Sequence, residues 1–107
     1  MSVKRVVLRA IARRDIDAVL HRYLGAAGEK TALGFIDALE RAYRHISRHP
    51  ASGSPRYAHE LDLPELRCWP IRRFPYLIFY IERDDRIDVW CNLHGERDIP
   101  AWMRVSG

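Results

Sequence analysis

The chain has little of what marks several classes of protein. Its 107 residues include only two cysteines, Cys68 and Cys91, and no C-x-x-C pair. Both lie in strand-like runs, so a disulfide is geometrically conceivable, but we predict buried free thiols and no zinc site. No apolar run approaches the roughly 20 residues that a membrane-spanning helix needs. The segment MSVKRVVLRAIARRD is too short and too charged for a secretory signal, so we expect a cytoplasmic protein with no membrane contact.

Signatures of common enzymes are missing too. The chain has no glycine-rich phosphate loop, no G-x-S-x-G and no H-E-x-x-H. A few serines and histidines are neighbours between residues 45 and 59, but their spacing does not pair a nucleophile with a base. We therefore predict no catalytic residue, no cofactor and no metal.

Lysine is scarce as well, since 16 of the 18 basic residues are arginine. Residues 1–60 carry 11 Lys/Arg against 6 Asp/Glu, whereas residues 61–107 carry 7 against 8. A basic half indicates an anionic partner, either nucleic acid or an acidic protein segment. The alternative is that the arginines of the predicted helices form a solvated outer face; these are Arg13, Arg14, Arg22, Arg41, Arg44 and Arg48.

The N-terminal half predicts one strand followed by a helical hairpin. Residues 3–9 are rich in β-branched side chains, and two stretches with apolar residues at helical spacing follow, from Ala12 and from Glu29. The sequence GAAG suits the turn between them, and the second helix should end before Pro50. Residues 49–66, with three prolines, form a long irregular connection.

The C-terminal half predicts three strands, at residues 67–71, 76–81 and 87–94, with a charged turn at 83–86. Pro70 places the first of them at a sheet edge or a bulge. In the last strand, residues 87, 89, 91 and 93 should share one face.

The order β-α-α-β-β-β predicts an α+β fold in a single domain, residues 1–107. We expect a two-layer sandwich in which the helical hairpin packs on a four-stranded, mainly antiparallel sheet. The other face should be less covered. Tyr76, Tyr80 and Trp90 are expected there, and an exposed aromatic face would need a partner.

The stretch RCWPIRRFPYLIFYIERDDRIDVWCNLHGERDIPAW resembles the ParE branch of the RelE/ParE toxin superfamily. An arginine-led strand, the pattern R(F/Y)PY.I.Y, a charged turn and I.V....H..RD carry the resemblance, which extends in element order over about residues 3–102. It implies the toxin of a type II toxin–antitoxin pair. Such a toxin would inhibit DNA gyrase and so block DNA replication. A ParD-like antitoxin with an acidic C-terminal segment would neutralise it in a hetero-oligomer.

The RelE branch of the superfamily offers the main alternative, a ribosome-dependent mRNA endoribonuclease. Its members resemble one another in having lysines near the long loop, an arginine in the central strand, an arginine after the last strand and a C-terminal tyrosine. Here only the third is present, as Arg97; the loop has Arg56 but no lysine, the strand position holds Leu77, and no tyrosine follows Tyr80. We therefore predict a binding protein rather than an enzyme. A non-toxic binding module is a further alternative.

Candidate binding residues lie at the predicted hairpin turn and after the last strand. Arg72 and Arg73 are either solvated or contact the antitoxin or its target, and His94 is either structural or part of the surface. Arg97 is the strongest candidate because its planar guanidinium binds carboxylate or phosphate in bidentate fashion. No sequence-specific nucleic-acid binding is expected of the chain alone. The full candidate set is Arg97, His94, Arg72, Arg73, Trp102, Tyr76, Trp90 and Asp98.

Overall fold

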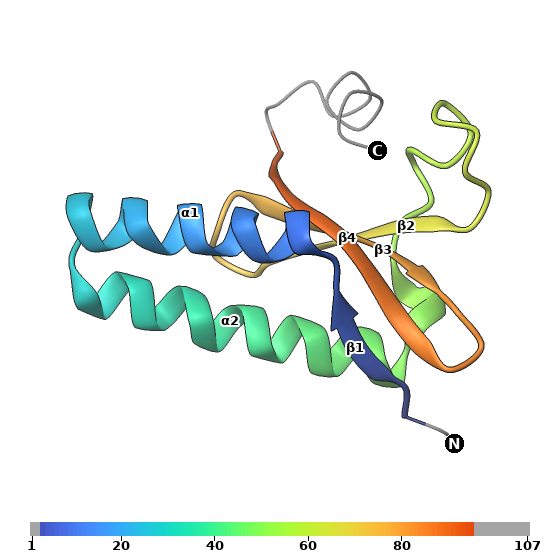
Figure 1. The fold of residues 1–107 in the computed structure, drawn as a ribbon, viewed down its shortest axis with the longest axis horizontal. Coiled ribbons are helices and arrows are strands. Elements are labelled where there is room, and N and C mark those ends of the chain that lie inside the picture. Colours follow the sequence, from blue (N-terminus) through green and yellow to red (C-terminus); the bar gives the residue numbers. More distant parts are fainter. Residues whose placement is uncertain (1–2, 96–107) are drawn as a thin grey trace.

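A computed structural model describes residues 3–95, and they form two helices and four strands in the predicted order (Figure 1). The α+β class and the helical hairpin on a four-stranded sheet are confirmed. Within this part of the chain, no helix is long and apolar enough to cross a membrane. The elements are β1 (Arg5–Leu8), α1 (Ala10–Ala26), α2 (Glu29–Arg48), a 3-10 turn (Pro50–Ser52), β2 (Leu66–Pro70), β3 (Tyr76–Glu82) and β4 (Arg86–His94).

The sheet has the strand order β1-β4-β3-β2. β2 pairs antiparallel with β3 and β3 with β4, whereas β1 runs parallel to β4. The prediction of a mainly antiparallel sheet is therefore confirmed. Pro70 lies at the end of the outer strand β2, opposite Leu77 of β3, and an outer strand is where a residue without an N–H is tolerated.

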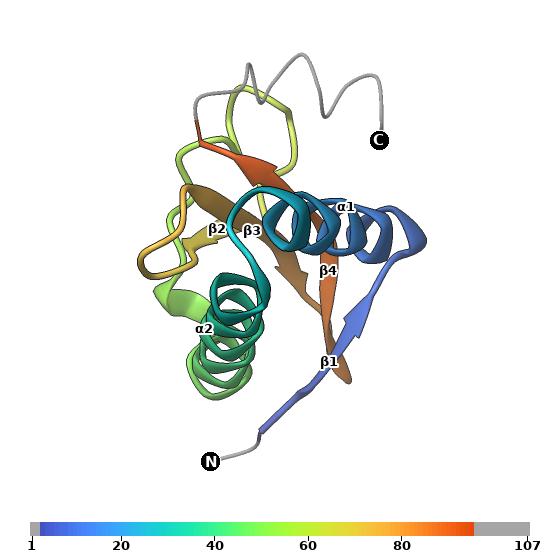
Figure 2. The same cartoon turned by 90° about the vertical axis from the view of Figure 1, so that its left-hand side faces the viewer.

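The two helices run side by side as a hairpin, as Figure 2 shows from a viewpoint along them. α2 buries one stripe, Phe35, Leu39, Ala42 and Ile46, at the spacing of a single helical face. Gly28 precedes α2 with φ of 91°, a left-handed conformation that glycine adopts without strain. The prediction of a break at GAAG is confirmed, and the second helix ends before Pro50 as expected.

The helices cover the sheet face that carries the tyrosines, which is the opposite of our prediction. Tyr76 is 6% exposed and Tyr80 is fully buried, and both pack in the core beneath α1 and α2. Every residue from Tyr76 to Ile81 is apolar or aromatic, so the pattern of β3 alone could not decide which face meets the helices. The Tyr80 hydroxyl is satisfied there, because it donates to the Pro50 carbonyl at 2.7 Å.

A β-bulge changes the face of β4 midway along the strand. Tyr80 pairs with Val89 but Phe79 pairs with Cys91, so Trp90 is an extra residue. A shift of one residue moves all later side chains to the other face. The prediction that residues 87, 89, 91 and 93 share a face is therefore wrong: Ile87 and Val89 join the core under the helices, and the last two lie on the opposite face.

That opposite face is covered, so the predicted exposed aromatic face is also wrong. Six buried residues form a second apolar cluster on it, and side chains of the long connection pack over them, chiefly Tyr57, Leu61 and Leu63. The connection therefore acts as a third layer. The cluster consists of Leu66, Cys68, Phe79, Ile81, Cys91 and Leu93.

Both cysteines are free and buried, as predicted. Burial raises the pKa of Cys68 and raises the pKa of Cys91 to about 12. Neither thiol is therefore an activated nucleophile, because the thiolate is the reactive form.

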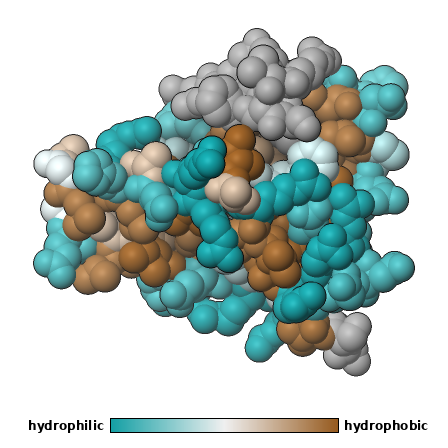
Figure 3. Space-filling view, in the orientation of Figure 1, coloured by the Kyte–Doolittle hydropathy of each residue, from teal (hydrophilic) through white to brown (hydrophobic). Residues whose placement is uncertain are grey.

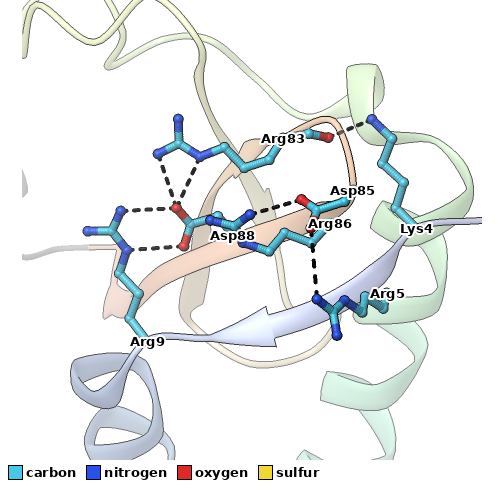
Figure 4. Close-up of polar contacts among 7 residues, drawn as sticks. All are labelled: Lys4, Arg5, Arg9, Arg83, Asp85, Arg86 and Asp88. Atoms are coloured by element: carbon cyan, nitrogen blue, oxygen red, sulfur yellow. Dashed lines mark hydrogen bonds and ion pairs between the residues drawn. The ribbon is translucent and has the colours of Figure 1, made fainter.

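Asp88 of β4 is a buried carboxylate held between two arginines (Figure 4). Arg9 donates from Nε and Nη2 to its two oxygens, each at 3.0 Å, and Arg83 donates to Oδ2 at 3.1 and 3.3 Å. The Arg9 guanidinium also lies 4.0 Å from the centre of the Trp90 ring. Burial raises the pKa of Asp88, but the hydrogen bonds from Arg9 and Arg83 outweigh it and hold the pKa below its usual value.

We expect Asp88→Asn to lower the free energy of unfolding by about 2 kcal/mol at pH 7. The loss is moderate because Arg9 and Arg83 are 42% and 36% exposed and regain water. Because the folded pKa is lowered, the charged carboxylate stabilises fully above the ordinary aspartate pKa of about 3.9, and this stabilisation disappears as the pH falls below it. Urea unfolding at pH 7 and pH 3 measures the difference between wild type and variant.

The difference in free energy of unfolding between wild type and Asp88→Asn should therefore be smaller at pH 3 than at pH 7. The matched control is Asp84→Asn, because Asp84 is exposed in the turn between β3 and β4. It should change the free energy of unfolding by less than about 0.5 kcal/mol at either pH. A difference for Asp88→Asn that is as large at pH 3 as at pH 7 would contradict this account.

Candidate functional site

Arg72 and Arg73 occupy the turn between β2 and β3, as predicted. The turn closes through the Ile71 N–H, which donates to the Tyr76 carbonyl, and the Phe74 N–H, which donates to the Ile71 carbonyl, each at 3.0 Å. Arg73 has φ of 76°, in the left-handed region. Both arginines are exposed, and neither forms an ion pair with an acidic residue of the described range 3–95.

A groove of about 670 Å³ separates this turn from α2. Its helical wall is hollow because Gly34, Ala38 and Ala42 follow one another at four-residue spacing and present one stripe of small side chains. We call this feature the turn groove. Its lining residues are Gly34, Asp37, Ala38, Arg41, Ala42, His45, Trp69, Pro70, Arg72, Arg73 and Phe74.

Aromatic side chains hold the walls of the turn groove in place. The Trp69 ring stacks on His45 with centroids 4.1 Å apart, and His45 Nε2 lies within hydrogen-bond distance of the Ser52 hydroxyl, at 2.9 Å. Phe74 meets the core ring of Phe35 edge to face at 5.3 Å. Because these rings continue into the core, the groove is a preformed hollow rather than a loose surface.

The turn groove combines an apolar floor with a positive rim. Arg41 pairs with Asp37 at 3.2 Å, but both are well exposed, so this pair contributes little. Arg72 and Arg73 add two positive charges with no acidic counterpart on the turn. Such a groove is suited to a protein segment that carries apolar side chains next to carboxylates, which arginine binds in bidentate geometry.

Tyr76 and His94 lie at the same end of the sheet as the turn, since they pair across β3 and β4. Their rings meet edge to face at 5.3 Å, and Arg22 Nη1 donates to the Tyr76 hydroxyl at 2.7 Å. Tyr76 is buried, so its ring belongs to the core; half-buried His94 lies at the rim of this end. The adjacent Gly95 N–H donates to the Pro75 carbonyl, which joins the strand end to the turn.

The other candidate residues are not brought to the turn groove. Trp90 lies half-buried beneath Arg9 in the second apolar cluster. Arg97, Asp98 and Trp102 are outside the residues that the structure describes, and their roles stay predictions. All six helix arginines that we named are exposed, which fits either a solvated face or contact with an anionic partner, so both alternatives stay predictions.

Sequence reasoning missed three residues that shape the turn groove, His45, Trp69 and Phe74, and named Arg41 only as one of the helix arginines. The small residues of α2 were the available signal, since their spacing marks one helix face with short side chains. Reading that stripe as a hollow, however, requires knowing that the β2–β3 turn lies opposite it.

Comparison with known proteins assigns the family. The model of the ParE toxin of the type II toxin–antitoxin system parDE matches residues 6–99, which is most of the chain. The chain belongs to the ParE toxin family. The resemblance found in the C-terminal half is therefore confirmed, and this ParE-family chain is the toxin component of a ParDE toxin–antitoxin system.

Comparison of the structure with solved structures finds the same kind of protein. The solved structure titled "Chromosomal ParDE TA system from P. aeruginosa" superposes with a TM-score of 0.73 and 17% sequence identity, covering 88% of this chain and 98% of that one. At 17% sequence identity, this match shows that the two chains share a fold and shows nothing further. A search of curated proteins gave no significant match.

Proposed function

We propose that this ParE-family toxin inhibits DNA gyrase and so blocks DNA replication, and that a cognate antitoxin neutralises it with an acidic segment. Family membership over residues 6–99 is the observation that carries the proposal. The turn groove supports the second half of it. Arg72 and Arg73, which are exposed and form no ion pair within residues 3–95, lie beside an apolar floor and match the chemistry of an acidic, partly apolar segment.

We propose further that the toxin acts by binding and not by catalysis. RNA cleavage needs cations beside the phosphate and groups that move protons. Leu77 occupies the strand position at which RelE-like toxins have an arginine. It packs against the second apolar cluster. Arg56, the one arginine in the long connection, lies with its guanidinium 4.7 Å from the centre of the Tyr57 ring. These placements favour the gyrase branch over the ribosome-dependent nuclease.

Expression of the chain alone in bacteria tests the proposal in cells. We expect growth arrest with filamentation and induction of the DNA-damage response, because a stalled gyrase leaves broken DNA. Co-expression of the cognate antitoxin should restore growth. Arrest with rapid cleavage of mRNA on ribosomes, and no DNA damage, would instead support the nuclease alternative. No arrest, with a folded protein, would indicate a non-toxic binding module.

A further inference from the structure

The outer edge of β1 is the feature from which we draw a second inference. β1 pairs with β4 on one side only, and no other strand of residues 3–95 pairs with its other side. We infer that this edge receives an extended acidic segment of the antitoxin, which adds to the sheet as a fifth strand. The inference rests on the proposed function only in taking the antitoxin as the partner.

The direction of the backbone groups shows which of them are available. The Lys4 N–H donates to the Ser47 carbonyl of α2, and the Ser47 hydroxyl donates to the Lys4 carbonyl, so Lys4 points away from β4. The Arg9 N–H donates to the Val89 carbonyl, so Arg9 points toward β4. In a strand, the N–H and C=O groups of alternate residues point to the same side. Val6 and Leu8 therefore direct their backbone groups outward.

A second groove lies along this edge, between β1 and the C-terminal half of α2. It has a volume of about 440 Å³, and Val3, Val6 and Tyr43 provide its apolar lining. Val3 is 65% exposed, so its side chain is accessible to a partner. Figure 3 shows a hydrophobic patch in the region of β1 with hydrophilic residues around it. An added strand would project alternate side chains into this groove.

Charge selects the kind of segment that fits. Arg44 and Arg48 of α2 line the groove and are exposed. Neither forms an ion pair with an acidic residue of the range 3–95. Arg5 has Asp85 at 3.8 Å, but both side chains are mostly exposed, so the pair is weak. A strand with carboxylates on its solvent side would meet this positive rim, whereas a basic strand would be repelled.

The same charges disfavour a second copy of the chain. Two β1 edges placed together would bring Arg5 of each copy, and the arginines of each α2, into one small area. Like charges opposite each other across strands are destabilising. The edge is also short, with Val6 and Leu8 alone free to pair, and short charged edges resist indiscriminate pairing. An acidic partner removes the repulsion, so it is favoured over self-association.

Hydrogen exchange by NMR tests the inference on the whole chain, alone and with its cognate acidic antitoxin. In the free protein the Val6 and Leu8 amides should exchange fast, whereas those of Val7 and Arg9 are already protected by β4. In the complex, exchange at Val6 and Leu8 should slow by about 10-fold or more.

Two variants test the same edge by affinity. Val6→Pro removes one outward N–H and leaves the hydrogen bonds between β1 and β4 intact. The double variant Arg44→Glu with Arg48→Glu reverses the charge on the rim of the groove. Each should weaken binding by about 10-fold, whereas the exposed control pair Arg13→Glu with Arg14→Glu on α1 should leave it unchanged.

The outcomes separate this inference from the proposed function. If the acidic protein binds Val6→Pro as tightly as wild type and the Val6 and Leu8 amides stay unprotected, the edge inference is overturned and the proposed function stands. If it does not bind the wild-type chain at all, the proposed neutralisation fails and the edge inference fails with it. Protection of these amides by a short DNA duplex, or by raising the concentration of the chain alone, would assign the edge to nucleic acid or to self-association and overturn the inference.

Discussion

Gly53→Ala should destabilise the fold by about 3 kcal/mol or more, although it adds only one methyl group. A Cβ at Gly53 would overlap the hydroxyl oxygen of Tyr80 and lie 2.9 Å from its Cζ and 3.0 Å from the Cβ of Arg67. Tyr80 is fully buried and cannot rotate away. The backbone of Gly53, with φ of −66°, is accessible to any residue, so the clash and not backbone strain is the cause.

The clash would also break a small hydrogen-bond network that attaches the long connection to the sheet. The Gly53 N–H donates to the Tyr80 hydroxyl at 3.1 Å, and Arg67 Nη1 donates to the Gly53 carbonyl at 2.8 Å. Burial raises the pKa of Tyr80, so the hydroxyl stays protonated and donates to Pro50. Displacing Gly53 leaves these buried groups without partners, and each such loss costs about 1–3 kcal/mol.

Gly25→Ala is the matched control, since it makes the same chemical change. Nothing lies within 4 Å of a Cβ at Gly25, which is inside α1 near its end. Alanine should therefore stabilise the protein there by about 0.5–1 kcal/mol. Urea unfolding at pH 7 measures both variants. Changes of opposite sign in the free energy of unfolding of the two variants would support the packing around Gly53. A Gly53→Ala variant whose free energy of unfolding lies within about 0.5 kcal/mol of wild type would contradict it.

The second large effect concerns binding. We expect Arg72→Glu with Arg73→Glu to weaken binding of the acidic antitoxin by about 100-fold, because two cations on the rim of the turn groove become anions. The fold should be retained, since both side chains are exposed and glutamate accepts the left-handed conformation of residue 73 no worse than arginine does. Isothermal titration calorimetry at low and high salt measures the effect.

Salt provides an internal check on the cause. Exposed charges are screened, so wild-type affinity should fall as salt rises, and the difference between wild type and the Arg72/Arg73 variant should narrow. The pair Arg13→Glu with Arg14→Glu, two adjacent exposed arginines on α1, controls for net charge. Equal losses in the two double variants would mean that net charge matters and the turn groove does not.

The sequence was sufficient for the parts of the fold that depend on local periodicity. α2 shows one apolar stripe over its whole length, and Pro70 and Pro50 mark a sheet edge and a helix end, so these were predicted. The bulge at Trp90 has no local signal, because its neighbours alternate as in an unbroken strand. The prediction of which face of β3 meets the helices was wrong because both faces are apolar, and only the folded structure shows that the helices cover one and the long connection the other.

The candidate site, too, could be predicted from the sequence only in part. Arg72 and Arg73 were predicted because a charged pair before Phe74-Pro75 indicates an exposed turn. The turn groove itself depends on α2 and that turn meeting across nearly 40 residues of sequence, and no spacing pattern encodes this distance. The outward backbone groups of β1 could not be predicted either, because the side on which β1 pairs is a property of the assembled sheet.

The supercoiling reaction of purified DNA gyrase tests the central claim most directly. Adding the purified ParE-family toxin should reduce supercoiling of relaxed plasmid and increase the amount of gyrase-cleaved DNA, and prior incubation with the acidic antitoxin should abolish both effects. Unimpaired supercoiling and no additional cleavage with the folded toxin in excess over gyrase would contradict the account.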